Sequence, residues 1–128
     1  MTATLTWSGV TARRMARHAL AEPSADLGPA AVAGLVCGAH AQVLSAAELS
    51  VGRRIAGATR ADVQHALWRE RILVKTFGPR GTVHLLAVDD LPMWTAALSA
   101  VPAHSPFPDG VRLTREHMEQ IVAAIGDA

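Results

Sequence analysis

The stretch from residue 59 to residue 88 constrains the fold most, because the spacing of its apolar residues changes once along its length. Its first part carries three apolar residues at helical spacing, Val63, Ala66 and Leu67. Two β-rich runs then follow at 72–77 and 82–88, and the turn sequence Gly-Pro-Arg-Gly lies between them. The sequence therefore predicts a helix that leads directly into a two-stranded hairpin.

A second helix is expected just before this one. Residues from Ser45 to Glu48 match a capping box, which predicts a helix from there to about Ala56. Thr59 and Asp62 would open the next helix after a glycine-containing turn of three to four residues. Two helices joined in this way form a helix-turn-helix, and a hairpin with an arginine at its tip makes it a winged helix. The expected fold class is mainly α with a small β-hairpin, a winged helix-turn-helix.

Further helices are expected on both sides of this unit. An amphipathic helix with a basic outer face is predicted over 11–21, and a short buried helix from Gly28-Pro29 to about Cys37, whose thiol should be buried and inert. A helix capped by Asp89 or Asp90 should pack beside the hairpin, and Thr114 should cap a last helix, 115–125. We expect a winged-helix domain at 1–101, then a proline-rich linker and the first helix of a missing second domain at 102–128.

The charge is distributed unevenly along the chain. Residues 10–88 carry ten basic and five acidic residues, whereas residues 89–128 carry two basic and six acidic ones. The basic part coincides with the predicted helix-turn-helix, which favours nucleic-acid binding over the alternative of a solvated surface of mixed charge. The candidate DNA-binding side chains are Arg60, Gln64, His65, Arg69 and Arg80. Arg80 would contact phosphate at the wing tip, and Trp68 is interpreted as half-buried packing.

Several classes of protein lack support in the sequence. There is no phosphate-binding loop, dinucleotide fingerprint, zinc-protease motif or nucleophile elbow, and one cysteine with six scattered histidines makes no metal set. We therefore expect neither cofactor nor metal. No apolar run approaches the roughly 18 to 20 residues that a membrane-spanning helix needs, and the N-terminus does not resemble a signal peptide. A cytoplasmic protein is expected.

One short polar segment could carry chemistry. Residues 38–44 lie between two predicted helices and should be extended, so His40 and Gln42 would project to the same side, roughly 6.5 to 7 Å apart at their backbones. Taken alone, a pair of this kind in a linker more often satisfies the ends of the neighbouring helices than carries out catalysis. Thr82 and His84, which alternate along the second hairpin strand, could likewise serve local hydrogen bonds.

Four blocks of sequence together resemble the winged-helix DNA glycosylases of the AlkZ/YcaQ type. The blocks are Leu5 to Leu20, His40-Ala-Gln42, Thr59 to Leu67 and Arg80-Gly-Thr-Val-His84, and the resemblance covers about residues 5–100. The resemblance implies that His40 and Gln42 are the catalytic pair, with histidine in place of the family's usual first glutamine. It also implies that the partner is double-stranded, alkylated DNA, and that the N-glycosidic bond of alkylated purines or crosslinks is hydrolysed.

The resemblance also bears on how much of the parent protein this chain represents. Members of that family are several times longer and have tandem winged helices and a C-terminal β-barrel, so we interpret the chain as an N-terminal fragment that would act with the remaining domains of its parent. Two alternatives stay open. The chain could be a winged-helix transcription regulator without catalytic activity, in which His40 and Gln42 have no chemical role, or a fragment with no activity of its own.

Overall fold

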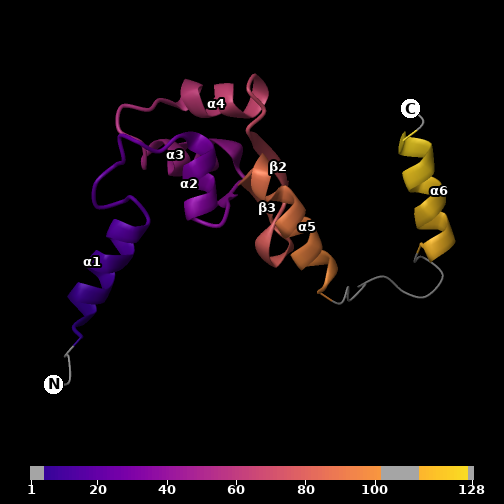
Figure 1. Ribbon diagram of the computed structural model, residues 1–128, viewed down its shortest axis with the longest axis horizontal. Helices are drawn as coiled ribbons and strands as arrows, with labels where there is room; N and C mark the ends of the chain where they lie inside the picture. Colours follow the sequence, from indigo (N-terminus) through magenta and orange to yellow (C-terminus); the bar gives the residue numbers. More distant parts are fainter. Residues whose placement is uncertain (1–4, 102–112, 127–128) are drawn as a thin grey trace.

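The computed structural model describes residues 5–101 and 113–126. Its centre consists of three helices, α2 (Pro29–Leu35), α3 (Leu44–Gly52) and α4 (Arg60–Trp68), which contact a small sheet at one side (Figure 1). The first strand, β1 (Ala39–His40), lies between α2 and α3 in the sequence.

The sheet has three antiparallel strands in the order β1-β3-β2. Strands β2 (Leu73–Phe77) and β3 (Val83–Ala87) form the predicted hairpin, in which Leu73 pairs with Ala87 and Phe77 with Val83. The short helix Pro79–Gly81 makes the turn between them. The chain order of helix, strand, two helices and hairpin is that of a winged helix, as predicted.

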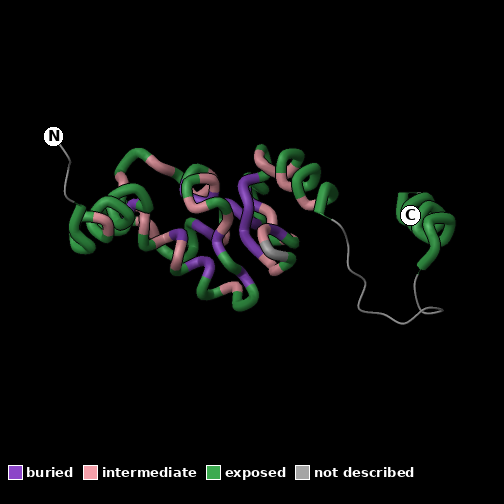
Figure 2. The backbone as a smooth tube through the Cα atoms, turned by 90° about the horizontal axis from the view of Figure 1, so that it is seen from below, coloured by how far each residue is buried: buried purple, intermediate pink, exposed green. Residues whose placement is uncertain are grey.

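The core lies where the three helices meet the sheet, which Figure 2 shows as the buried centre of the chain. Every one of these six elements contributes to a single buried apolar cluster. Its members are Val32, Ala33, Ala39, Ala41, Ala47, Val51, Val63, Ala66, Leu67, Leu73 and Leu85. Five of the eleven are alanines, so α2, α3, α4 and β1 can approach one another closely. The apolar stripe predicted on α4 is the part of this cluster that α4 supplies.

The capping box at the start of α4 is confirmed, whereas the one predicted at the start of α3 is wrong. The backbone N–H and the hydroxyl of Thr59 both donate to Asp62 Oδ2, each at 2.7 Å, in a capping box. The residue that precedes α3 is Val43, which has no capping side chain. Glu48 cannot reach back to Ser45 because its carboxylate is buried and bound to α4.

The connection between α3 and α4 is also longer than predicted, at residues 53–59. Helix α3 stops early because the chain pairs with the segment before α2: Ser24 N–H donates to Arg54 O at 2.9 Å, and Ala56 N–H donates to Ser24 O at 2.8 Å. The Arg54 guanidinium ties the same region together by donating from Nε to His18 O at 2.9 Å. Its partial burial lowers the pKa of Arg54.

The segment before the core differs from the prediction in two places. Helix α1 spans Trp7–Arg17 rather than 11–21, because Thr6 Oγ1 caps it and the backbone turns left-handed at Ala19, with φ 51°. Helix α2 begins at Pro29 as expected but ends at Leu35. Cys37 follows with φ 56° and is exposed, so the predicted buried thiol is wrong.

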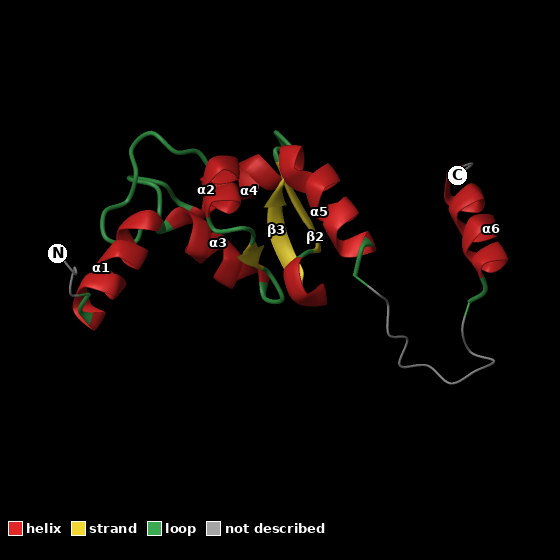
Figure 3. Cartoon of the chain, turned by 60° about the horizontal axis from the view of Figure 1, so that its bottom comes forward, coloured by secondary structure: helices red, strands yellow, loops and turns green. Residues whose placement is uncertain are grey.

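Two helices follow the wing. Helix α5 (Leu91–Ser99) comes directly after a short turn of helix at Val88–Asp90 and lies beside the sheet (Figure 3). Helix α6 (Arg115–Gly126) is exposed along its whole length, and Thr114 Oγ1 accepts from His117 N–H at 3.1 Å, as its predicted cap should. The predicted proline-rich linker lies outside the described residues. No helix in the described ranges is long and apolar enough to cross a membrane.

Candidate DNA-binding and catalytic site

His40 and Gln42 are both exposed, on either side of a buried alanine. Ala39 and Ala41 point into the core with 3% and 0% exposure, and Ala41 N–H donates to Val83 O at 2.7 Å. Side chains alternate between the two faces of an extended segment, so the burial of both alanines turns His40 and Gln42 outward together. Within residues 5–101 and 113–126, no hydrogen bond joins either side chain to another residue. The arrangement leaves both of them available to a ligand.

A second histidine lies next to His40. His84 is the register partner of His40 in the β1–β3 pair, and the two ring centroids are 5.4 Å apart at an interplanar angle of 83°. Unlike His40, His84 is buried, and its Nδ1 is 2.7 Å from Thr82 O. Because a carbonyl only accepts, Nδ1 carries the hydrogen in this contact. The local hydrogen bond expected of His84 is therefore present.

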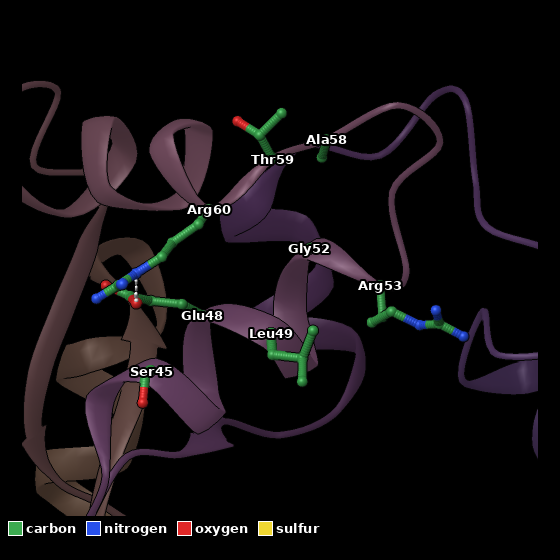
Figure 4. Close-up of a pocket in the computed structure, with 8 residues that line it drawn as sticks. All are labelled: Ser45, Glu48, Leu49, Gly52, Arg53, Ala58, Thr59 and Arg60. Atoms are coloured by element: carbon green, nitrogen blue, oxygen red, sulfur yellow. Dashed lines mark hydrogen bonds and ion pairs between the residues drawn. The ribbon is translucent and has the colours of Figure 1, made fainter.

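The candidate DNA-binding residues on α4 are organised by a carboxylate from α3. Glu48 has a fully buried side chain, and its Oε2 accepts from Arg60 Nε at 2.5 Å while its Oε1 accepts from Gln64 Nε2 at 3.0 Å. Figure 4 shows Arg60 and Glu48 reaching toward each other, whereas Arg53 points away. Beside this pair lies a hollow of about 200 Å³ between α3 and the start of α4. The Arg60 side chain is 66% exposed, so it can also meet a ligand.

The other candidates on α4 face solvent. His65 and Arg69 are exposed, and His65 Nδ1 lies 3.3 Å from Glu70 Oε1. Trp68 lies beside them and is 60% exposed, so the prediction of half-buried packing is wrong. It is exposed because Val63, Ala66 and Leu67 already occupy the face of α4 that meets the core. Arg80 belongs to the turn Pro79–Gly81, and its side chain lies outside the described part.

The structure thus adds two residues that the sequence pattern did not assign to the site. The position of Glu48 on α3 could have revealed its burial. It stands three residues before Val51, so the two side chains share the helix face that packs into the core. His84 alternates with Thr82, which suggested local hydrogen bonding, but its contact with His40 depends on strand pairing between distant segments. Among the described residues, no group of three or more metal-ligating side chains comes together.

Comparisons with known proteins point in one direction. A family model described as DNA glycosylase AlkZ-like matches residues 32–128. A protein of Streptomyces sahachiroi named interstrand DNA cross-link repair glycosylase is 33% identical over 135 residues, which cover 88% of this chain and 36% of that protein. The solved structure of the Streptomyces sahachiroi DNA glycosylase AlkZ matches with a TM-score of 0.69 and 28% identity, over 98% of this chain and 34% of that one. The chain thus spans about a third of the length of these relatives.

Proposed function

We infer that this chain, which belongs to the AlkZ-like family of DNA glycosylases, is the DNA-binding winged-helix module of an enzyme that hydrolyses the N-glycosidic bond of alkylated or crosslinked purines. The observation that carries this proposal is the outward-facing pair His40 and Gln42, which occupies the segment that resembles the family's catalytic motif. The curated relative's name, a glycosylase of interstrand crosslink repair, supports the substrate class.

The chemistry suits neutral side chains. A purine alkylated at N7 or N3 is already cationic, so it leaves without a strong general acid. Water forms the new bond to C1′. The electrons of the breaking C1′–N bond neutralise the departing base, and the sugar has oxocarbenium character in the transition state. Gln42 can hold this water through its amide, and His40 can orient it and accept the proton that it loses. The products are an abasic deoxyribose and the neutral alkylated base.

The outer side of α4 is proposed to hold the DNA. Arg60, Gln64 and His65 lie on this helix and Arg69 follows at its C-terminal cap. Arginines neutralise phosphates whatever the base sequence. Arg80 is proposed to add a phosphate contact from the wing. Base chemistry usually requires the base to leave the stack, and a site on the exposed edge of the sheet could receive an extruded base or act on a bulky adduct in place.

We also propose that α6 packs against another part of a longer parent chain. Four apolar side chains of α6 are exposed, with fractions between 42% and 71%, and an apolar stripe of this kind is normally covered. They are Met118, Ile121, Val122 and Ile125. The exposed stripe fits our proposal that residues 1–101 form one module, which is followed by a linker and the first helix of a second domain.

The test is base release from duplex DNA that contains a single N7-methylguanine. This chain and the full product of its reading frame are incubated with the duplex, and abasic sites are revealed by alkaline cleavage. We expect the full product to release the base, and His40→Ala with Gln42→Ala to lower its rate at least about 100-fold. Val43→Ala, an exposed neighbour, serves as the matched control and should keep the parent rate.

Two results would contradict the proposal. The first is a full product that makes no abasic sites and instead protects one particular promoter sequence, as a transcription regulator would. The second is a double variant that releases the base as fast as the parent.

A further inference from the structure

The buried histidine of β3 has no part in the hydrolysis proposed above. His84 and Glu48 are the two buried polar side chains in the described ranges. Glu48 has an evident task in joining α3 to α4. Burial of a histidine gains less than burial of a leucine would, and the one hydrogen bond given for His84 is local, so its position next to His40 calls for a further explanation.

The ring of His84 is fixed on several sides. Its Nδ1 donates to Thr82 O at 2.7 Å, which sets the tautomer and the plane of the ring. Two glycines make room for it: a Cβ at Gly78 would lie 3.1 Å from His84 Cβ, Cγ and Nδ1, and one at Gly38 would lie 3.3 Å from His84 Cδ2. Gly38 also has a φ of 95°, which favours glycine. The surroundings of His84 therefore favour one ring orientation.

His40 has no comparable support of its own. It is exposed, it ends a two-residue strand, and among the described residues it has no hydrogen-bond partner. The contact that restrains it is the one with His84, whose centroid distance of 5.4 Å and angle of 83° match the favourable edge-to-face geometry of aromatic pairs. A side chain that orients water must hold one rotamer, because a displacement of about 1 Å can cost a large part of the rate.

We propose that His84 is a positioning residue, which holds the imidazole of His40 in the rotamer that orients the attacking water. This inference rests on the proposed function. The flat ring of His84 is the feature that restrains His40, and close packing against Gly38 and Gly78 fixes that ring together with the hydrogen bond to Thr82.

Two variants separate this role from a purely structural one. His84→Phe keeps a flat ring beside His40 but removes the donor to Thr82, whereas His84→Ala removes both. In single-turnover base release by the full product, we expect His84→Ala to lower the maximal rate about tenfold, with the half-saturating concentration within about twofold of the parent. His84→Phe should stay within about threefold of the parent rate. A maximal rate in His84→Ala that equals the parent's, or equal losses in the two variants, would overturn the proposal.

A second readout needs no catalysis. In NMR spectra of this chain without DNA, the ring-proton resonances of His40 should shift in His84→Ala, because a neighbouring ring is lost, and should shift less in His84→Phe. His65, which lies on α4, serves as the internal control for an intact fold. Unchanged His40 resonances in His84→Ala would refute the positioning role whether or not base is released. A parent that releases no base would instead refute the proposed function.

Discussion

The two polar clusters of this molecule are built in opposite ways. Between α3 and α4, the buried member is a carboxylate, Glu48, and the residues around it, Arg60 and Gln64, are bound to it. At the β1–β3 edge, the buried member is an imidazole held by a backbone carbonyl, and its exposed neighbour His40 keeps both ring nitrogens available within the described structure. The first cluster joins two helices, whereas the second presents unused polar atoms at a supported position. The difference indicates that the cluster around Glu48 stabilises the fold, whereas the cluster around His84 leaves polar atoms free to meet a ligand.

The largest effect is expected when Glu48 is removed, which tests whether the cluster between α3 and α4 stabilises the fold. Glu48→Ala takes away the acceptor of two α4 side chains and leaves a cavity, so we expect the free energy of unfolding to fall by about 3 kcal/mol. Glu48→Gln keeps the volume and should lose less. Urea unfolding followed by circular dichroism measures both. Leu49→Ala, at an exposed neighbouring position on α3, should change stability by less than about 0.5 kcal/mol. A Glu48→Ala protein as stable as the Leu49→Ala control would show that this cluster does not hold the helices together.

A smaller effect is expected on DNA binding, and its measurement tests whether Glu48 offsets the charge of Arg60. The charge of Arg60 is opposed by Glu48, whereas no ion pair involves Arg69 among the described residues. Arg69→Ala should therefore weaken binding of duplex DNA several-fold on every sequence and lower the salt slope by about 0.9. Arg60→Ala should change that slope by less than half as much. Fluorescence anisotropy over a range of salt concentrations gives both slopes, and equal changes would mean that Glu48 does not offset Arg60.

The smallest effect concerns pH and the start of α4. The hydroxyl and the backbone N–H of Thr59 donate to Asp62, which holds the pKa of that carboxyl below its usual range. A pKa that is lower in the folded state stabilises the fold fully above the unfolded value, about 3.9, and this stabilisation is lost as the pH falls through the folded value. Thermal unfolding should show the parent slightly more stable than Asp62→Asn at pH 7, with a smaller gap at pH 3. A gap that widens toward pH 3 would be inconsistent with this cap.

The sequence predicts those parts of the fold that depend on local patterns. The helix after Thr59 and the hairpin after Arg71 follow from a cap, an apolar stripe and a turn, all within a few residues. Ser45 and Glu48 show the limit of such reasoning. They match a capping box locally, but Glu48 gains more from two donors on α4 than from one N–H at the helix start. That choice depends on residues 12 and 16 positions away.

The candidate site also combines features that follow from local patterns with contacts that depend on distant segments. The sequence predicts that His40 and Gln42 project to the same side of an extended segment. That this side faces outward follows from the burial of Ala39 and Ala41 in the structure. The contact between His40 and His84 depends on the register of β1 on β3, which joins segments more than 40 residues apart and leaves no local signal. Trp68 was misjudged for a related reason, since three smaller residues of α4 suffice to cover the core.

We propose that the β1–β3 edge performs the chemistry and that α4 holds the DNA. The most direct test of this proposal measures, for the full product, both the dissociation constant and the maximal single-turnover rate of base release on an N7-methylguanine duplex. His40→Ala with Gln42→Ala should lower the maximal rate at least about 100-fold and leave the dissociation constant within about threefold. Arg69→Ala should instead raise the dissociation constant several-fold and leave the maximal rate within about threefold. A His40 and Gln42 double variant that keeps the parent's maximal rate, with any loss confined to affinity, would contradict the account.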